Sequence, residues 1–310
     1  MSKPAEPKLK ASRYGIGEWF GHPIGSISAG DRRNFAKAAT DSKIKKNCPF
    51  RGVEVSQKWC NKKGGVCSIV TYTQDAAGDV AVGRAGELVT TCPSRFWAGN
   101  DLFKVIGREI LQCDVPIIVK EVGFLASVDG KSDRDVGRID TVLVSNNNGL
   151  ADWCAIEIQA VYFSGDSMGP EFKNLGRSSG VLPFPVGKRR PDFRSSGPKR
   201  LMPQLQIKVP TLRRWGKKMG VIVDRPFFES LGTMRREAHL SNADIVWYVV
   251  SYEGRSNKIV ILDRVYTTLE SSVEALTAGQ SVTKDQFERE INECLADPKA
   301  SLRGKIIKVS

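Results

Sequence analysis

The chain has 310 residues, of which 41% are hydrophobic and 26% are charged, an ordinary composition for a globular protein with a substantial core. Its length suits one large domain or two smaller ones, because a domain usually contains roughly 100 to 200 residues. The 47 Lys and Arg residues outnumber the 34 Asp and Glu residues, which gives a net charge of +13 and a pI near 9.5. This charge favours a polyanionic partner: a nucleic acid is our first expectation, and an anionic membrane surface is the alternative.

The sequence carries no sign of membrane insertion or secretion. No run approaches the roughly 18 apolar residues of a membrane span, and residues 1–15 lack the apolar core of a signal peptide. We therefore expect an intracellular, cytoplasmic protein. Seven cysteines, an odd number in such a chain, indicate reduced thiols, metal ligands or core residues in place of a disulfide framework.

The first third of the chain is expected to be rich in loops. Its predicted elements are a basic disordered tail, a helix ending in a lysine cluster, a glycine-rich region of short strands and a longer helix, at residues 1–12, 30–46, 47–98 and 100–113. In the longer helix, Leu102, Ile106 and Ile110 recur every four residues behind an Asn100 cap.

Strands dominate the prediction after that helix. The expected strands are residues 115–128, 137–145, 153–163, 244–252 and 258–266. Residues 164–200 are rich in Gly, Pro, Ser and Arg and are expected to form a functional loop, while residues 206–220 look partly helical. The chain should end in a helix, because Thr283 and Gln286 form a capping box before an apolar stripe of Phe287, Ile291 and Leu295.

Two of these strands carry carboxylates among apolar residues. Strict alternation sends Glu157 and Gln159 to the same face of their strand, and Asp140 on the preceding strand can join them. Two carboxylates converging at one end of a sheet form a hard-oxygen site suited to Mg²⁺, which keeps several waters for a phosphate substrate. The pattern suggests a phosphodiesterase centre, and the alternative is a solvated strand face without chemistry.

Other chemistries find little support in the residue types. The two histidines, His22 and His239, are isolated from each other, so the chain has too few histidines for a histidine-based metal or acid–base centre. No glycine-rich phosphate loop opens a helix, so nucleotide hydrolysis and dinucleotide redox chemistry are not indicated. The order of helix, strand, Asp140 strand, Glu157 strand and helix matches nucleases with the PD-(D/E)XK core. Gln159 departs from that pattern, because it occupies the position where a lysine is usual.

The cysteines fall into two groups. Cys113, Cys154 and Cys294 lie within apolar periodic segments and are expected to be core thiols. The other four lie in the loop-rich stretch among lysines that include Lys62 and Lys63, and they are Cys48, Cys60, Cys67 and Cys92. Four thiolates can form a closed tetrahedral site for zinc or iron, although the spacings are not the paired CxxC of a zinc ribbon. The lysines beside such a metal-binding loop region could face DNA.

Five segments between about residues 45 and 250 are similar to one known family, and they are "CPF", "GVCS", "CPSRFW", "DWCAIEIQAVYFSG" and "LQIKVPTLRRWGKKMGV". Together they resemble the NotI and EagI group of type II restriction endonucleases. The resemblance implies a structural four-cysteine iron site and a PD-(D/E)XK core with glutamine in place of lysine, so Gln159 matches this group. It also implies catalytic roles for Glu121, Asp140, Glu157 and Gln159. It further implies a homodimer that cuts a short GC-rich palindrome in double-stranded DNA with Mg²⁺ and works beside a cognate DNA methyltransferase.

Two basic segments are candidates for DNA contact. Residues 187–200 have no regular periodicity and include Arg189, Arg190 and Arg194, so they could form an arm that DNA orders or simply a solvated loop. Residues 211–219 group basic side chains around Trp215, namely Arg213, Arg214, Lys217 and Lys218, which suit phosphate contact. A third basic segment, residues 234–239, is expected to be an ordinary helix surface.

We therefore expect an α/β (α+β) protein with a mixed sheet flanked by helices. Residues 1–98 would form a basic tail and a four-cysteine, DNA-contacting region, and residues 99–310 the nuclease core. The expected activity is sequence-specific, Mg²⁺-dependent hydrolysis of duplex DNA, with iron as the structural metal and zinc as its alternative. Two other functions stay open: a four-cysteine DNA-binding protein without catalysis, and a modification-dependent or repair nuclease.

Overall fold

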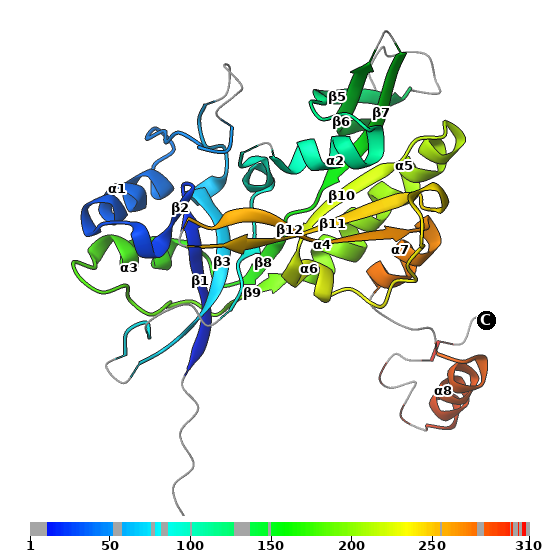
Figure 1. Cartoon of the computed structure of the whole chain (residues 1–310). Helices are drawn as coiled ribbons and strands as arrows, with labels where there is room; N and C mark the ends of the chain where they lie inside the picture. The colour runs from blue at the N-terminus through cyan, green and yellow to red at the C-terminus, as the bar shows by residue number, and fades with distance from the viewer. Residues whose placement is uncertain are drawn as a thin grey trace, which may run out of the picture.

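The structure is a computed structural model of the whole chain, in which residues 11–51, 58–75, 78–81, 86–99, 101–126, 137–147, 150–254, 256–277, 282–297, 299, 303 and 306–307 are described. A four-stranded and a six-stranded sheet organise these residues, and helices pack against both (Figure 1). The described residues also form a small sheet of two strands. The predicted basic tail lies almost entirely outside the described residues. In the described ranges, no helix combines the length and the apolar character that crossing a bilayer requires.

The N-terminal sheet has four strands in the order β2-β1-β3-β4. They are β1 (Ser12–Trp19), β2 (His22–Pro23), β3 (Val66–Thr73) and β4 (Val89–Thr90), and every pairing is antiparallel. The helices α1 (Ala29–Thr40) and α3 (Gly169–Arg177) pack against each other beside this sheet. Trp19 is fully buried between them, with its ring 5.7 Å from Phe35 on α1 and 5.5 Å from Phe172 on α3.

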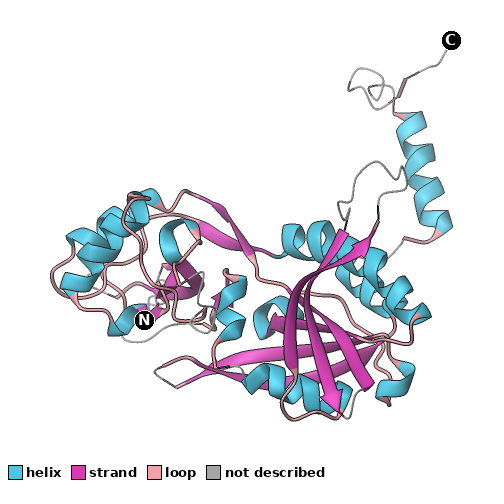
Figure 2. Ribbon diagram, turned by 90° about the horizontal axis from the view of Figure 1, so that it is seen from above, coloured by secondary structure: helices cyan, strands magenta, loops and turns pink. Residues whose placement is uncertain are grey.

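The second sheet has six strands in the order β12-β11-β10-β7-β6-β5. The strands are β5 (Ile117–Leu125), β6 (Gly137–Asn147), β7 (Leu150–Ile158), β10 (Met219–Asp224), β11 (Ile245–Glu253) and β12 (Lys258–Thr267). β10 runs parallel to β7 and β11, and the other pairs are antiparallel, so the sheet is mixed. Figure 2 shows the twist of this sheet and the helices on its two faces.

Alternating side chains of the six-stranded sheet supply two cores. On one face, Ile156 and Tyr248 pack with Ile106 of α2 (Asp101–Leu111). On the other face, Val221 and other apolar side chains pack with Leu205 of α5 (Met202–Arg214), and α7 (Leu269–Thr277) lies beside α5. Because the central strands β10 and β11 are covered on both faces, they read as nearly continuous apolar runs in the sequence, whereas most residues of the edge strand β5 are exposed.

The remaining elements lie between the strands of the two sheets or, for the last helix, after them. They are η1 (Ile24–Ser26), η2 (Lys63–Gly65), η3 (Pro93–Trp97), β8 (Tyr162–Gly165), β9 (Arg189–Asp192), α4 (Phe193–Ser196), η4 (Gly197–Leu201), α6 (Arg225–Glu229), η5 (Leu240–Asn242) and α8 (Lys284–Ala296). The segment after β7 returns to the N-terminal sheet, where Arg13 donates to the carbonyl of Pro185 and Arg32 to that of Gly180. The division at residues 98 and 99 stays a prediction, and extensive contacts cross it.

Three local predictions were wrong. Residues 164–200 do not form one long loop, because they contain α3, β9 and α4. Residues 234–239 are not a helix: the backbone N–H of Glu237 donates to the carbonyl of Tyr266, which holds this segment beside β12. The first helix ends at Thr40, short of the lysine cluster.

Strand β1 was missed because its sequence, SRYGIGEW, carries two glycines. A Cβ atom at Gly15 would lie 2.6 Å from Pro185, and one at Gly17 would lie 2.4 Å from Leu88. Both glycines are therefore explained by close packing of other segments on the strand, and they do not mark a turn.

A buried ion pair joins the two sheets. Nε of Arg95, on η3, lies 2.9 Å from Oε2 of Glu18 on β1, and both side chains are at most 3% exposed. Nη2 of Arg95 also donates to the carbonyl of Asn257, next to the β11–β12 turn, and Nδ2 of Asn257 donates to Glu18. One arginine thus links a carboxylate of the first sheet to the turn between β11 and β12 of the second.

We predict that Arg95→Met destabilises the chain by about 3–5 kcal/mol, because Glu18 would then be buried without its counter-ion. Arg236→Met is the matched control: Arg236 pairs with Asp263 at 3.0 Å, but both side chains are more than 40% exposed, so the expected loss is about 1 kcal/mol or less. Urea-induced unfolding measures both values. Equal losses in the two variants would contradict a central role for the buried pair.

Candidate active site

Three acidic residues, Glu121, Asp140 and Glu157, lie at one level on the neighbouring strands β5, β6 and β7 and form what we call the acidic row. In the β6–β7 ladder Thr141 lies opposite Ile156, so the next position places Asp140 opposite Glu157. In the β5–β6 ladder Lys120 pairs with Thr141 and Val122 with Ile139, which places Glu121 beside Asp140. Residues directly opposite each other in a sheet share a face, so the register brings the Asp140 and Glu157 side chains together.

The two central carboxylates have different environments. Asp140 is exposed, whereas Glu157 is only 8% exposed on the face that α5 covers. Burial raises the pKa of Glu157 above its usual value, the ammonium of Lys208 lowers it, and the negative charge of Asp140 raises it further. Because the register places Asp140 opposite Glu157, the negative charge of Asp140 disfavours ionisation of Glu157.

Lys208 is the partner of Glu157 that sequence reasoning missed. Its Nζ donates to Oε2 of Glu157 at 2.7 Å, and the side chains are 4% and 10% exposed. On α5, Leu205, Val209 and Leu212 form a buried apolar stripe, and Lys208 is the charged residue within it. A lysine inside the apolar face of a helix is the signal that could have identified this residue.

Gln159 follows the end of β7 at Ile158. Its backbone N–H donates to the carbonyl of Ile222 at 3.0 Å, which continues the pairing with β10 beyond the strand. Its side chain is buried, and Nε2 donates to the carbonyl of Ala160. The amide therefore lies at the end of the acidic row with one of its donors bound to the protein's own backbone.

Glu121 stands apart from the two central carboxylates. Its side chain is 73% exposed, and Oε2 lies 3.4 Å from Nη1 of Arg138. Its backbone adopts the left-handed region with φ of 56°, which is unusual for a residue other than glycine. Glu121 thus lies on the predicted strand and beside Asp140 in the ladder, but its side chain pairs with an arginine.

Among the described residues, no three His, Cys, Asp or Glu side chains approach one point closely enough to hold a metal ion. Two carboxylates at the level of Asp140 and Glu157 still fit Mg²⁺, because this ion commonly uses one or two protein carboxylates together with water and substrate oxygens. The donor set is therefore compatible with a metal that a phosphate substrate helps to bind.

The four predicted cysteine ligands come together in two backbone-bonded pairs. The N–H of Cys60 donates to the carbonyl of Lys46, and the N–H of Cys48 donates to that of Lys58, which ties the first two segments together. The N–H of Cys92 donates to the carbonyl of Cys67 at 3.2 Å, which ties the other two. The four cysteines thus gather beside the N-terminal sheet.

These thiols affect one another's pKa values, but among the described residues no three of them approach one point closely enough to hold a metal ion. Burial raises the pKa values of Cys48, Cys60 and Cys67, and the proximity of Cys92 raises each of them further. Buried neutral thiols do not attract one another, whereas a bound cation would draw four thiolates to one point. The four cysteines therefore remain candidate ligands for a structural metal.

Of the other cysteines, two behave as expected and one does not. Cys113 and Cys154 are buried in the core beneath α2, as predicted. Cys294 is only partly buried, and none of the residues of its helix, α8, is buried. The prediction of a core thiol at Cys294 was wrong, although the capping box of Thr283 and Gln286 is present.

The predicted DNA-contacting residues divide by exposure. Arg189 is buried, with Nη1 2.8 Å from Oε2 of Glu171 and its other nitrogens donating to the carbonyls of Asp166 and Ser167. Lys62 is half-buried and donates to the carbonyl of Thr91 at 2.6 Å. Their donors serve the protein's own fold.

The other candidates reach the surface in varying degree. Arg213 is paired with Asp244 and Glu270, and Lys217 with Asp152. The remaining ones are exposed in the structure, and they are Lys63, Arg190, Arg194 and Arg214. A phosphate backbone can reach these four without breaking a buried ion pair.

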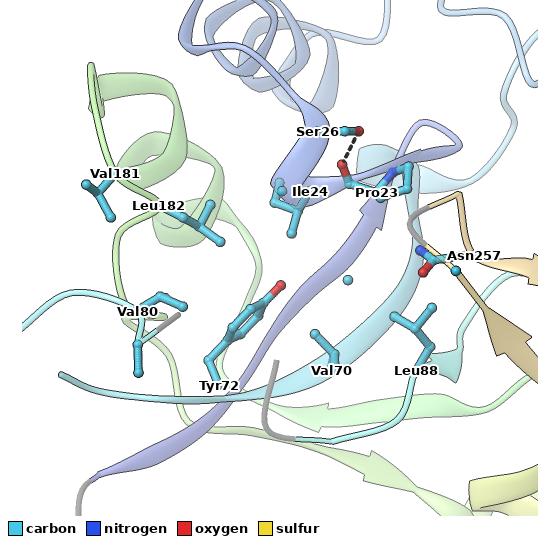
Figure 3. A pocket seen from close by; sticks show the side chains of 14 residues that line it. Pro23, Ile24, Ser26, Val70, Tyr72, Val80, Leu88, Val181, Leu182 and Asn257 are labelled. Atoms are coloured by element: carbon cyan, nitrogen blue, oxygen red, sulfur yellow. Dashed lines mark hydrogen bonds between the residues drawn. The ribbon is translucent and has the colours of Figure 1, made fainter. Parts of the chain in front are cut away.

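A separate cavity of about 770 Å³ lies in the N-terminal part of the fold (Figure 3). Apolar side chains such as Val70, Leu88 and Leu182 line it, and the hydroxyl of Tyr72 donates to the carbonyl of Ile16. None of its lining residues is charged. This cavity does not suit a polyanion and is distinct from the acidic row.

A comparison with protein families matches residues 33–260 to the family described as Restriction endonuclease NotI. A comparison with curated proteins finds no match. The matched range includes the four clustered cysteines, the acidic row and Lys208, and it covers most of the chain. The chain therefore belongs to the NotI restriction endonuclease family, a family of nucleases that act on DNA.

Proposed function

We propose that the protein is a type II restriction endonuclease that cuts both strands of a short sequence in duplex DNA and requires Mg²⁺. The observation that carries the proposal is the placement of Asp140 opposite Glu157 on adjacent strands, in a chain of this nuclease family. A surplus of basic residues, with a net charge of +13, supports binding to a phosphate backbone.

We propose the following roles for the residues of the site. Asp140 and Glu157 would hold Mg²⁺, which when bound neutralises charge on the phosphate and lowers the pKa of a bound water. Gln159 would orient water near the scissile phosphate, and Glu121 would assist from the neighbouring strand. This arrangement on a mixed sheet with flanking helices is our reason for proposing a PD-(D/E)XK core.

A structural metal at Cys48, Cys60, Cys67 and Cys92 is part of the proposal. Iron is our first choice, from the resemblance to the family, and zinc is the alternative with the same thiolate ligands. The exposed residues Lys63, Arg190, Arg194 and Arg214 are the proposed phosphate contacts. Arg213 and Lys217 lie near Arg214 at the C-terminal end of α5 and are further candidates. A homodimer and a cognate DNA methyltransferase follow from the resemblance alone.

We predict that Asp140→Asn and Glu157→Gln each lower the cleavage rate by at least about 10³-fold, because a bound metal contributes several kcal/mol to transition-state stabilisation. Binding to the same DNA without metal should change little, since neither change removes a positive charge. Single-turnover cleavage of a plasmid and gel retardation measure the two properties.

The control for those variants is Glu288→Gln, which removes one carboxylate from the exposed helix α8 and should leave the cleavage rate unchanged. Retention of the wild-type cleavage rate in the Asp140 or the Glu157 variant would refute the assignment. Retardation of DNA by the wild-type chain without any cleavage in Mg²⁺ would instead support a DNA-binding protein without catalysis.

We further predict that Cys67→Ser lowers the metal content of the purified protein by about one equivalent per chain and destabilises its N-terminal part, because structural metal binding contributes folding free energy. Cys154→Ser, in the core of the six-stranded sheet, is the control and should leave metal content unchanged. Elemental analysis decides between iron, zinc and no metal. An unchanged metal content in Cys67→Ser would contradict the four-cysteine site.

A last prediction concerns specificity. Guanine offers O6 and N7 to a bidentate arginine, a contact worth about 1–3 kcal/mol against a wrong base. A two-fold symmetric dimer requires a palindromic target, so we expect a GC-only palindrome of about six to eight base pairs. Sequencing the ends of digested genomic DNA tests this, and cuts at asymmetric or AT-containing sites would show that the family's specificity does not transfer.

A further inference from the structure

The buried ion pair between Lys208 and Glu157 points to a role beyond stability. Within the part of the chain that the structure describes, Glu157 is the hydrogen-bond partner of the Lys208 ammonium, at 2.7 Å. An ammonium has three N–H donors, so two donors remain for a further acceptor. Lys208 is 3% exposed, and a buried donor without an acceptor is unfavourable unless a ligand completes it.

Stability alone does not explain a lysine at this position. Leu205, Val209 and Leu212 pack the same face of α5 into an apolar core. Replacing a buried ion pair by apolar residues of similar volume is often neutral or stabilising. An apolar residue at position 208 facing an apolar residue at position 157 would thus hold α5 on the sheet at least as well.

The acidic row also lacks a positive charge of its own. Asp140 and Glu157 are both acidic, and Gln159 supplies a neutral amide that donates to the carbonyl of Ala160. Phosphodiester hydrolysis places additional negative charge on the phosphate oxygens in the transition state, and buried cations aimed at such charge stabilise it strongly. Among the described residues, Arg138 pairs with the exposed Glu121, whereas Lys208 is the buried cation that contacts Glu157 itself.

We propose that Lys208 is a further catalytic residue, whose ammonium contacts the scissile phosphate and supplies the positive charge that Gln159 cannot. The proposal rests on the nuclease function proposed above. Lys208 reaches the row from α5, whereas Gln159 lies two residues beyond Glu157 on the same strand segment. The site thus combines side chains from two strands and a helix.

The proposed reaction is simple hydrolysis. The oxygen of a water forms a bond to phosphorus, and the bond from phosphorus to one bridging oxygen breaks. One hydrogen of the water replaces phosphorus on the leaving oxygen, and the other stays on the phosphate product or passes to solvent. Lys208 stays protonated throughout and donates to a non-bridging oxygen, where negative charge grows as the new bond forms.

A different role for Lys208 gives a different measurable outcome. If Lys208 were only a counter-ion that occupies the place of the metal next to Glu157, its loss would change the Mg²⁺ concentration needed for half-maximal rate. The rate constant at saturating Mg²⁺ would then stay the same. A contact with the phosphate instead predicts a lower rate constant at saturating Mg²⁺ and saturating protein.

The test compares Lys208→Met, Lys208→Gln and Lys208→Arg with the wild-type chain and with Lys173→Met. Lys173 is exposed on α3, so its substitution removes the same charge without touching the row. Single-turnover cleavage of duplex DNA containing the site that the wild type cuts gives the rate constant. The dissociation constant for that duplex in the absence of metal and thermal unfolding are measured for every variant.

We expect Lys208→Met and Lys208→Gln to lower the rate constant by about 10²-fold or more, as removal of one transition-state donor does elsewhere. Lys208→Arg should recover part of the rate, and Lys173→Met should match the wild type. DNA binding without metal should stay within about three-fold in all variants, as expected for a contact that matters mainly in the transition state.

Wild-type rate constants in Lys208→Met and Lys208→Gln would overturn the proposal, and so would a change confined to the Mg²⁺ requirement. Failure of both variants to fold and to bind DNA would assign Lys208 to the fold and would also overturn it. A wild-type chain that cuts no duplex DNA would refute the proposed nuclease function itself, which distinguishes the two failures.

Discussion

The antiparallel register between β6 and β7 determines what this molecule can do. Because Thr141 lies opposite Ile156, Asp140 falls opposite Glu157, and a shift of one residue would send one of them to the other face. The register is fixed by apolar partners on both faces of these strands, with Leu143 and Ile156 in one core and Val142 and Ala155 in the other. The chemistry proposed for this site therefore depends on core packing.

Buried polar groups tie the four-cysteine region to the same sheet. Asp224, at the end of β10, accepts the N–H of Thr90 at 2.5 Å and the N–H of Phe227 at 3.0 Å, and burial raises its pKa to about 6. The carbonyl of Thr90 accepts the N–H of Val161 at 2.7 Å, just beyond Gln159. Since Cys92 is two residues from Thr90, a metal held by the cysteines would stiffen the segment that positions the end of β7.

The sequence allowed a good prediction where the signal is local. Alternation placed Glu157 and Gln159 on one face, and the structure has the predicted strand up to Ile158. The predicted strand that bears Asp140 is present as β6. Residues 164–200 were misread because glycine, proline and serine there serve helix starts and close packing. Their order depends on distant partners, such as Glu171 for Arg189.

Lys208 could not be assigned from its own neighbourhood for the same reason. Its partner Glu157 is 51 residues earlier in the chain, and the two meet only when α5 packs on the sheet. A charged residue in an apolar stripe signals an unusual environment, but the chain alone does not name the group it meets. Arg95 and Glu18 are a second instance, in which tertiary packing decides that two ordinary surface residue types are buried.

A crystal structure of the protein with its duplex DNA and Ca²⁺, an ion that commonly replaces Mg²⁺ without supporting cleavage, tests the central claim most directly. The account predicts a cation held by Asp140 and Glu157 against the scissile phosphate, with Nζ of Lys208 in hydrogen-bond contact with that phosphate. A cation and phosphate bound away from these two carboxylates would contradict it.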